Sequence, residues 1–275
     1  MKGLAAQPEG TLVDRAIVAL GTGPLSAERL ARDVLALPTA PSAVADRLAV
    51  ALLGADPRVR RLPDGRWSLV AAAQGSPLIE ECGFAVVDVE TSGARQARED
   101  RITEIAVVIV HGGRRELVFD SLVNPERPVD PWVTRITGIT SAMVEQAPTF
   151  SEIADEILGL LAGRIFVAHN ARYDWRFVTA AVRRARFLRL DGPVLCTVRL
   201  ARRLVPAVES WGLDSLTHFF GFENRARHRA GGDALVTAAL LERLLGLARQ
   251  GGVRTLQDLE LLQAPRKAPK RKRSA

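Results

Sequence analysis

One short segment, GFAVVDVETSG at residues 83–93, limits the folds open to this chain more than any other feature. Its run of apolar and β-branched residues is typical of a buried strand, yet the strand also carries Asp88 and Glu90. Alternate side chains of a strand lie on one face, so both carboxylates point the same way while Val87 and Val89 face the other side. Two like unit charges about 4 Å apart repel by about 1 kcal/mol in water and about 4 kcal/mol at an effective dielectric constant of about 20. The pair therefore predicts either a bound cation or a strand end that emerges into water.

Two later segments each place a further acid on an apolar face. In IFVAHNARYDWRFV, Asp174 lies just inside a helix that follows a strand, and it shares a helical face with Phe177 and Val178. In HRAGGDALVTAALL, Asp233 shares a face with apolar residues of a long helix, and His228 lies five residues upstream in the loop. A single acid in such a position is more often a helix cap or an ion-pair partner. Three separate elements with this pattern favour one common site.

The segments DVETSG, HNARYD and HRAGGD occur in this order, and they resemble the three exonuclease motifs of the DnaQ-like DEDDh 3′–5′ exonucleases. That family includes the proofreading epsilon subunit of bacterial DNA polymerase III. The resemblance spans residues 82–249 and includes SLVNPERPVDPWVTRITGITSAMV, between the first two motifs. It implies an α/β fold of the ribonuclease H-like type, in which a mixed sheet carries flanking helices.

The resemblance also implies the roles of individual residues. Two divalent ions would be held by Asp88, Glu90, Asp174 and Asp233, and His228 would be the general base. The 3′ nucleotide would be bound by Thr91, Ser92, Ile139 and Asn170. Two neighbouring polar residues stay outside the catalytic set: His169 is expected to have a structural, hydrogen-bonding role, and Glu104 to be an outer acid or an ion-pair partner.

The residue types fit this chemistry independently of the resemblance. Hard oxygen ligands suit Mg²⁺ or Mn²⁺ better than zinc, and four carboxylates offset the charge of two such ions. Two ions about 3.5–4 Å apart can activate a water molecule on one side of a phosphodiester and stabilise the leaving oxygen on the other. An imidazole, whose unperturbed pKa is about 6.5, can accept the proton of that water near neutral pH.

Residues 1–72 predict a separate small domain. Segments 11–20, 26–37 and 42–54 have apolar residues at helical spacing, and the turn sequence PDG joins the two β-leaning runs RVRRL and RWSLV. Three helices followed by a hairpin resemble a winged helix-turn-helix. The third helix carries little positive charge, so base reading is poorly supported, and contact with DNA phosphates through the hairpin arginines remains open beside a protein-docking or purely structural role.

The remaining segments and the composition set the outer limits. A length of 275 residues favours two domains. Cys82 and Cys196 stand far apart in the sequence and have no CxxC or HxxxH companions, so neither a zinc site nor a disulfide framework is suggested. Residues 73–81 read as a linker and residues 251–275 as a basic, disordered tail, whose last eleven residues carry six of the charges behind the net charge of +7. No apolar run is long enough to cross a membrane, so the chain is expected to be cytoplasmic without a membrane partner.

The function predicted from these observations is hydrolysis of DNA from its 3′ end by a metal-dependent 3′–5′ exonuclease in proofreading or repair. The expected partners are single-stranded or frayed DNA 3′ ends, or RNA, and a polymerase or repair protein bound through the N-terminal domain. One alternative is an exoribonuclease that trims RNA 3′ ends, because phosphodiester hydrolysis does not itself depend on the sugar. The other is a winged-helix DNA-binding regulator without catalytic activity.

Overall fold

The computed structural model of the chain describes residues 3–8, 11–21, 23–56, 58–70, 76–93, 100–205, 208–224 and 226–264. The chain forms two compact units, which we call the small unit (residues 8–75) and the large unit (residues 1–7 and 76–275). All the residues predicted to carry chemistry belong to the large unit.

The small unit consists of α1 (Leu12–Leu20), α2 (Ala27–Asp33), α3 (Ser42–Leu53) and the antiparallel pair β2 (Val59–Arg61) and β3 (Trp67–Leu69). The Thr11 side chain caps α1 by accepting a hydrogen bond from the Asp14 backbone N–H at 3.1 Å. Leu25 joins β3 through an antiparallel bridge to Trp67. The predicted order of three helices and a hairpin is present, and the assignment to the winged-helix class stays a prediction.

The large unit is built on a five-stranded mixed sheet with the strand order β6-β5-β4-β7-β9. Strands β4 (Phe84–Thr91), β5 (Ile102–His111) and β6 (Arg114–Leu122) are antiparallel neighbours. On the other side of β4, the strands β7 (Ile165–Ala168) and β9 (Val194–Cys196) run parallel to it. The prediction of an α/β fold with a mixed sheet is confirmed, and the strand that carries both acids lies at its centre.

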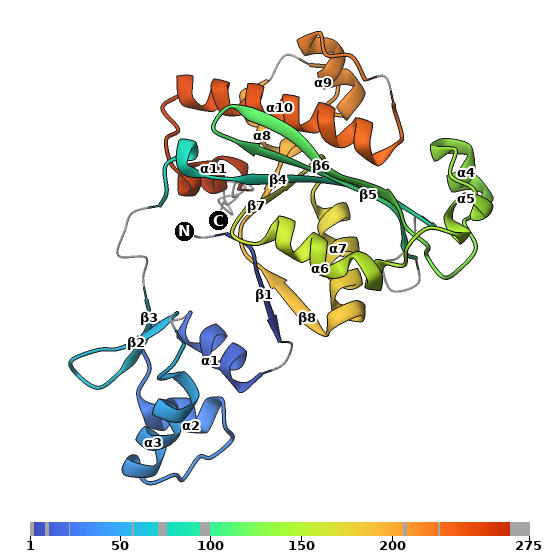
Figure 1. Cartoon of the computed structure of the whole chain (residues 1–275). Coiled ribbons are helices and arrows are strands. Elements are labelled where there is room, and N and C mark those ends of the chain that lie inside the picture. Colours follow the sequence, from blue (N-terminus) through green and yellow to red (C-terminus); the bar gives the residue numbers. More distant parts are fainter. Residues whose placement is uncertain are drawn as a thin grey trace, which may run out of the picture. The chain divides into compact units, whose positions relative to one another are not determined.

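Helices cover both faces of this sheet, as Figure 1 shows. On one face lie α6 (Phe150–Leu161) and α7 (Arg172–Arg186), and on the other lie α8 (Thr197–Leu204), α10 (Ala230–Gln250) and α11 (Leu256–Gln263). Along β4, Phe84 and Val86 pack into the α10 side, whereas Ala85, Val87 and Val89 pack into the α7 side. Asp88 and Glu90 therefore continue the row of side chains that faces α10.

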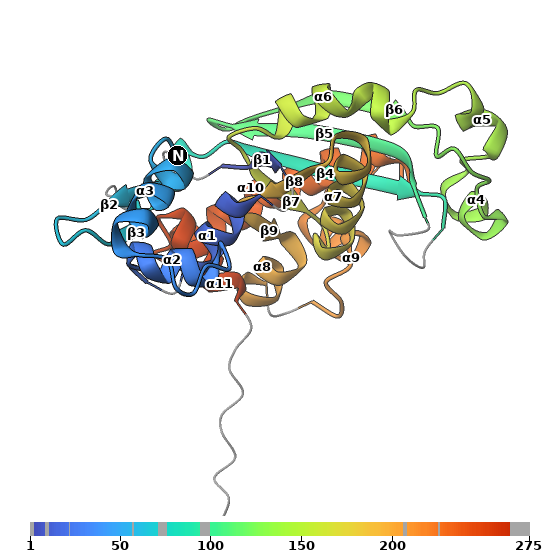
Figure 2. The ribbon, with the colours of Figure 1, turned by 90° about the horizontal axis from the view of Figure 1, so that it is seen from below.

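The remaining elements lie at the margins of the sheet. They are the short 3₁₀ turn η1 (Ile79–Glu81), α4 (Pro131–Thr137), α5 (Ser141–Glu145), β8 (Leu188–Asp191) and α9 (Leu213–Phe220). In Figure 2, α4 and α5 lie beyond the end of the sheet towards which β4 runs. The backbone N–H of Asp130, which caps α4, donates to the Ser92 carbonyl at 2.9 Å, so this pair of helices is tied to the end of β4.

The N-terminal strand β1 (Ala5–Pro8) pairs with β8, and its residues 5–7 belong to the large unit. Leu4 extends the same attachment, because its backbone N–H donates to the Arg164 carbonyl at 2.7 Å. The expected small domain of residues 1–72 therefore differs from the structure at its start. A four-residue strand that completes a pair with a partner more than 180 residues away leaves little local pattern in the sequence.

The C-terminal segment differs from the sequence-based expectation in the same way. Within the predicted tail of residues 251–275, residues 256–263 form α11, whose Leu256 and Leu259 are buried against the sheet face that carries α10. The Thr255 hydroxyl caps this helix by accepting from the Asp258 backbone N–H at 3.2 Å. The last eleven residues, which hold the basic charges, lie outside the described residues. Among the described helices, none has the length and apolar character needed to cross a membrane.

Candidate active site

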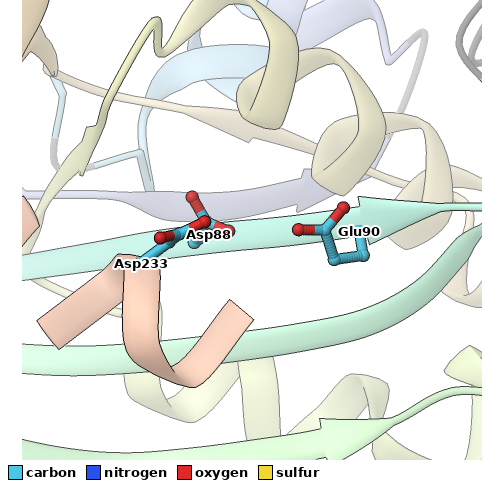
Figure 3. Close-up of side chains that lie close together, drawn as sticks. All are labelled: Asp88, Glu90 and Asp233. Carbon is cyan, nitrogen blue, oxygen red and sulfur yellow. The ribbon is translucent and has the colours of Figure 1, made fainter. Parts of the chain in front are cut away.

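The site begins on β4, where the side-chain row that faces α10 changes from apolar to acidic. Figure 3 shows the carboxylates of Asp88 and Asp233 beside each other, with Glu90 further along the same strand. One carboxylate oxygen from each of these three residues lies within 4.8 Å of the other two. Alternation along β4 places Asp88 and Glu90 on the same face, and Asp233 lies in the first turn of α10.

Asp174 reaches the site from α7. It lies in the first turn of that helix, and its side chain is 4% exposed. Its Oδ1 accepts a hydrogen bond from the Val89 backbone N–H at 3.3 Å. This N–H is available because β7 pairs with β4 only as far as Val86. The early separation of these two parallel strands thus lets Asp174 bind the backbone of Val89, the residue between Asp88 and Glu90 in the sequence.

Asp233 is held by the loop that precedes α10. Its Oδ1 accepts from Asn224 Nδ2 at 2.5 Å, and its Oδ2 accepts from the His228 backbone N–H at 3.1 Å. His228 is half-buried and has a positive φ of 57°, which is uncommon for a residue other than glycine. Such backbone strain persists where the surrounding contacts over-determine the conformation, and it is concentrated at functional sites.

The glycines of HRAGGD are required by close approach rather than by φ. A Cβ at Gly231 would lie 2.1 Å from Oδ2 of Asp120 on β6, and a Cβ at Gly232 would lie 2.3 Å from the carbonyl oxygen of Ala226. Both distances are far below van der Waals contact. The two glycines therefore let the start of α10 approach β6 and its own preceding loop, which brings Asp233 to the acids on β4.

All four acids have raised pKa values, with burial as the largest cause. Burial and the charges of Asp233, Glu104 and Asp174 raise the pKa of Glu90 to about 8. Burial raises the pKa of Asp174 to about 7, and burial followed by the charges of its carboxylate neighbours raises the pKa of Asp88 well above its ordinary value. The pKa of Asp233 is raised by burial and partly restored by the Asn224 and His228 hydrogen bonds.

This arrangement fits divalent cations with oxygen ligands. Carboxylates that lie close together and are partly buried favour binding of a cation. Among the described residues, the cluster contains neither a cysteine sulfur nor a histidine nitrogen. A hard cation would lower the four pKa values together by favouring the ionised acids. The prediction that the chain has a divalent-metal site is thereby supported at the level of residue type and geometry.

Of the four residues predicted to bind the 3′ nucleotide, two are engaged in structural hydrogen bonds. Thr91 is buried, and its hydroxyl donates to the Gly93 carbonyl at 2.8 Å and shares a hydrogen bond of 2.7 Å with the Tyr173 hydroxyl. Ser92 is also buried, and its hydroxyl accepts from the Arg101 backbone N–H at 3.0 Å. These contacts shape the end of β4 and leave the two hydroxyls turned inward.

The other two residues predicted to bind the nucleotide differ from each other. The Ile139 side chain is fully buried in a cluster with Val129, Val133 and Val144, so the structure does not bring it to the surface beside the acids. Asn170 is exposed, has a positive φ of 67°, and lies four residues before Asp174. Of the four, only Asn170 has an exposed side chain beside the start of α7.

The structure adds two residues that sequence reasoning left out of the site, Glu104 and Arg229. Glu104 is opposite Glu90 in the β4–β5 register, is 2% exposed, and forms an ion pair with Arg229. The signal for Glu104 was present, because it is an acid inside the apolar strand run RITEIAVVIV. Arg229 carried no local signal, since its role depends on how the loop before α10 folds against β5.

His169 has the structural position expected for it. Its Nδ1 shares a hydrogen bond of 2.8 Å with the Thr197 hydroxyl, and burial lowers the pKa of its imidazole to about 4. The ring is therefore neutral at physiological pH and joins the end of β7 to the start of α8. This geometry supports the hydrogen-bonding role over a catalytic one.

The fold and the acidic site together define an α/β nuclease domain of the type that binds divalent metal ions. Residues 85–241 match the RNase_T family model, described as exonuclease, and the chain belongs to this family. The predicted DnaQ-like 3′–5′ exonuclease domain is confirmed by this match. The matched residues lie entirely in the large unit.

Relatives and a solved structure agree with this assignment. The chain is 35% identical over 179 residues to the 3′-5′ exonuclease DinG of Bacillus subtilis, a match that covers 65% of this chain and 19% of that protein. It is 32% identical over 162 residues to the DNA polymerase III subunit epsilon of Aquifex aeolicus, covering 59% of this chain and 80% of that one. The chain thus spans less than a third of the length of several curated relatives, although it covers most of the epsilon subunit. Exonuclease X, solved with 5′ overhanging duplex DNA, aligns with a TM-score of 0.53 and 28% identity over 66% of this chain and 99% of that one.

Proposed function

We propose that the protein is a metal-dependent exonuclease that removes nucleotides from DNA 3′ ends in proofreading or repair. The observation that carries the proposal is the cluster of Asp88, Glu90 and Asp233, with Asp174 buried against the backbone of Val89. A cation would reverse the raised pKa values of these four acids. The relatives named as a 3′-5′ exonuclease and as a polymerase III epsilon subunit support the direction of cleavage and the DNA substrate.

The proposed site holds two Mg²⁺ or Mn²⁺ ions on Asp88, Glu90, Asp174 and Asp233. When bound, these ions supply Lewis acidity and lower the pKa of a coordinated water molecule. The chain itself contributes orientation and a proton acceptor: His228 accepts the proton of the attacking water, and Asn224 and the loop backbone fix Asp233. The exposed Asn170 side chain contacts the terminal nucleotide.

We also propose that the small unit recruits a polymerase or repair partner rather than reading DNA bases. Three of the four arginines of the hairpin region already pair with acids of the same unit: Arg58 with Asp56, Arg61 with Asp46, and Arg66 with Asp64. The unit as a whole carries eight arginines and seven acids in its sequence. A surface with so little unpaired positive charge offers weak attraction to phosphates.

The experiment that tests the nuclease proposal uses purified protein and three 5′-labelled substrates: single-stranded DNA, duplex DNA with a mismatched 3′ end, and RNA of matched sequence. Each is incubated with Mg²⁺, with Mn²⁺ or with a chelator, and the products are resolved by length. A ladder of progressively shorter DNA fragments that requires the cation supports the proposal. Products released from internal positions, cleavage that persists in chelator, or a preference for the RNA arm would contradict it.

A further inference from the structure

The residue after His228 is fixed by an ion pair with a buried acid, and the proposed chemistry does not use this pair. Arg229 Nε donates to Glu104 Oε1 at 2.9 Å and to Oε2 at 3.1 Å, and Arg229 Nη2 donates to Oε1 at 2.5 Å. The backbone N–H of Ala230 donates to Oε2 at 2.8 Å. A single carboxylate on β5 thus holds both the side chain of Arg229 and the first residue of α10.

These contacts engage both oxygens of Glu104. Three N–H donors, those of Arg229 Nε, Arg229 Nη2 and Ala230 N, bind the carboxylate, and the single Nε hydrogen is shared between its two oxygens. Glu104 lies directly opposite Glu90 and adds its charge to the field that raises the pKa of that residue, while the Arg229 charge acts in the opposite direction. A buried acid next to the acidic cluster is therefore neutralised from within the chain.

The geometry restricts the path of the chain at His228 from both sides. On one side Arg227 forms an ion pair with Asp214 of α9, and on the other side Arg229 is bound to Glu104 of β5. Between them, the His228 backbone N–H donates to Asp233. Of the two ion pairs, the one at Arg229 has the more deeply buried acid, because the Glu104 side chain is 2% exposed whereas that of Asp214 is 55% exposed.

We propose that Glu104 and Arg229 are positioning residues that set the direction of the His228 imidazole. The two-nitrogen contact of the guanidinium fixes the orientation of Arg229, and the hydrogen bond from Ala230 fixes the start of α10. Because His228 directly precedes these two residues, their backbone holds it in its positive-φ conformation. The role assigned to His228 rests on the function proposed above. We call the hydrogen bonds from Arg229 and Ala230 to Glu104 the clamp. Its effect on the conformation of His228 can be tested without measuring catalysis.

The kinetic test is a double-mutant cycle on single-turnover cleavage of a 5′-labelled single-stranded DNA in Mg²⁺. Glu104→Gln is expected to lower the rate constant about 10- to 100-fold, as loss of an outer-shell partner typically does. His228→Ala is expected to lower it about 10²- to 10⁴-fold, the usual contribution of a general base. If Glu104 acts through His228, the double variant will match His228→Ala within about twofold, since residues that act as a unit are not additive.

A matched control comes from a second bidentate pair on the opposite face of the sheet. Arg186 donates to Asp155 at 2.7 and 2.9 Å, and this pair joins α7 to α6 on the sheet face opposite to α10. Asp155→Asn is expected to leave the rate constant unchanged. A double variant that loses the full Glu104→Gln factor on top of the His228→Ala factor would overturn the proposal, as would a Glu104→Gln rate equal to that of the parent protein.

Two further measurements separate the clamp from folding and from the proposed function. If Glu104→Gln does not fold, the pair variant Glu104→Met with Arg229→Met removes the clamp without leaving a buried charge, and it enters the same cycle. Imidazole NMR of the cation-free protein, with the His228 signals assigned by their loss in His228→Ala, is expected to show that removing the clamp shifts the His228 signals and leaves those of His111 unchanged. Unchanged His228 signals would overturn the clamp, whereas an inactive parent protein with shifted signals would overturn only the proposed function.

Discussion

The acids of the candidate active site and those of the small-unit hairpin region are in opposite electrostatic situations. In the small unit, hydrogen bonds from Arg58 and Arg66 lower the pKa values of Asp56 and Asp64. In the large unit, burial and mutual repulsion raise the pKa values of the acids on β4, with Glu90 reaching about 8. Paired acids favour the folded state, whereas crowded acids oppose it unless a cation binds. The crowded acids therefore lower the stability of the cation-free large unit, which is typical of residues arranged for function rather than for folding.

Removal of one crowded acid is expected to have the largest effect. Replacing Asp88 with Asn is expected to lower nuclease activity by ~10³-fold or more, because several kcal/mol of transition-state stabilisation depend on the cations. The same change should raise the melting temperature of the cation-free protein at pH 8, since it removes a carboxyl group whose raised pKa opposes folding in the absence of a cation. Cleavage assays and thermal unfolding in chelator measure the two effects.

Opposite signs for activity and stability are the specific outcome expected of Asp88→Asn. An acid that served only as a structural ion-pair partner would lower both when replaced. Asp64→Asn in the small unit is the matched control, because its partner Arg66 holds it at the surface and the predicted effect on cleavage is nil. Retained cation-dependent cleavage by Asp88→Asn would remove this residue from the metal site.

Local periods in the sequence account for the orientation of the four acids, and the resemblance to the exonuclease motifs assigns them to one site. Alternation along β4 places Asp88 and Glu90 on one face, and helical spacing directs Asp174 and Asp233 inward, but each pattern alone is also typical of a helix cap or an ion-pair partner. The hydrogen bonds of Glu104 to a residue 125 positions away depend on strand register and on the loop path. The burial of Ile139 similarly follows from how α4 and α5 pack, which the family resemblance does not specify.

The ends of the chain show why composition was a weaker guide than periodicity. The segment predicted as a tail contains a capping pair, Thr255 and Asp258, which is typical of the start of a helix. The six basic residues beyond this pair favour disorder, so composition alone predicts a tail over the whole segment. The strand β1 is too short to show a period of its own, and its partner β8 is equally short. Both segments are ordered by tertiary contacts with the large unit, and such contacts are not encoded in a local window.

The next largest effect is expected at the proposed proton acceptor. His228→Ala should lower the cleavage rate about 10²- to 10⁴-fold and remove the fall in rate that protonation of an imidazole causes at acidic pH. The pH dependence of single-turnover cleavage measures both, and His218→Ala is the matched control because His218 is exposed on α9. An unchanged pH profile in His228→Ala would exclude the residue as the base.

Cation binding should appear as a pH-dependent change in stability. The pKa of Glu90 is about 8 in the folded, cation-free protein against an ordinary value of 4.5, so the folded state retains a proton that the unfolded state has lost between these values. Stability of the cation-free protein should therefore fall as the pH rises from 4.5 to 8. Added Mg²⁺ or Mn²⁺ should raise the melting temperature more at pH 8 than at pH 6. A cation effect that is equal at the two pH values would contradict crowded acids as the binding site.

The smallest effect is expected in the small unit, and its sign should be reversed. Asp56 accepts from Arg58 at 2.6 and 2.9 Å, and its pKa is lowered, so its contribution is present above the unfolded pKa and is lost as the pH falls through the folded one. Asp56→Asn should lower the stability of this unit by about 1 kcal/mol at pH 7, the upper range for a partly exposed ion pair, and leave cleavage of short single strands unchanged.

Urea unfolding followed by fluorescence of Trp67, the tryptophan in the core of this unit, measures the change in stability, and the cleavage assay measures the nuclease activity. A large loss of cleavage by a folded Asp56→Asn protein would mean that the two units are not energetically separate, because nothing in the chemistry of the acidic site requires this aspartate.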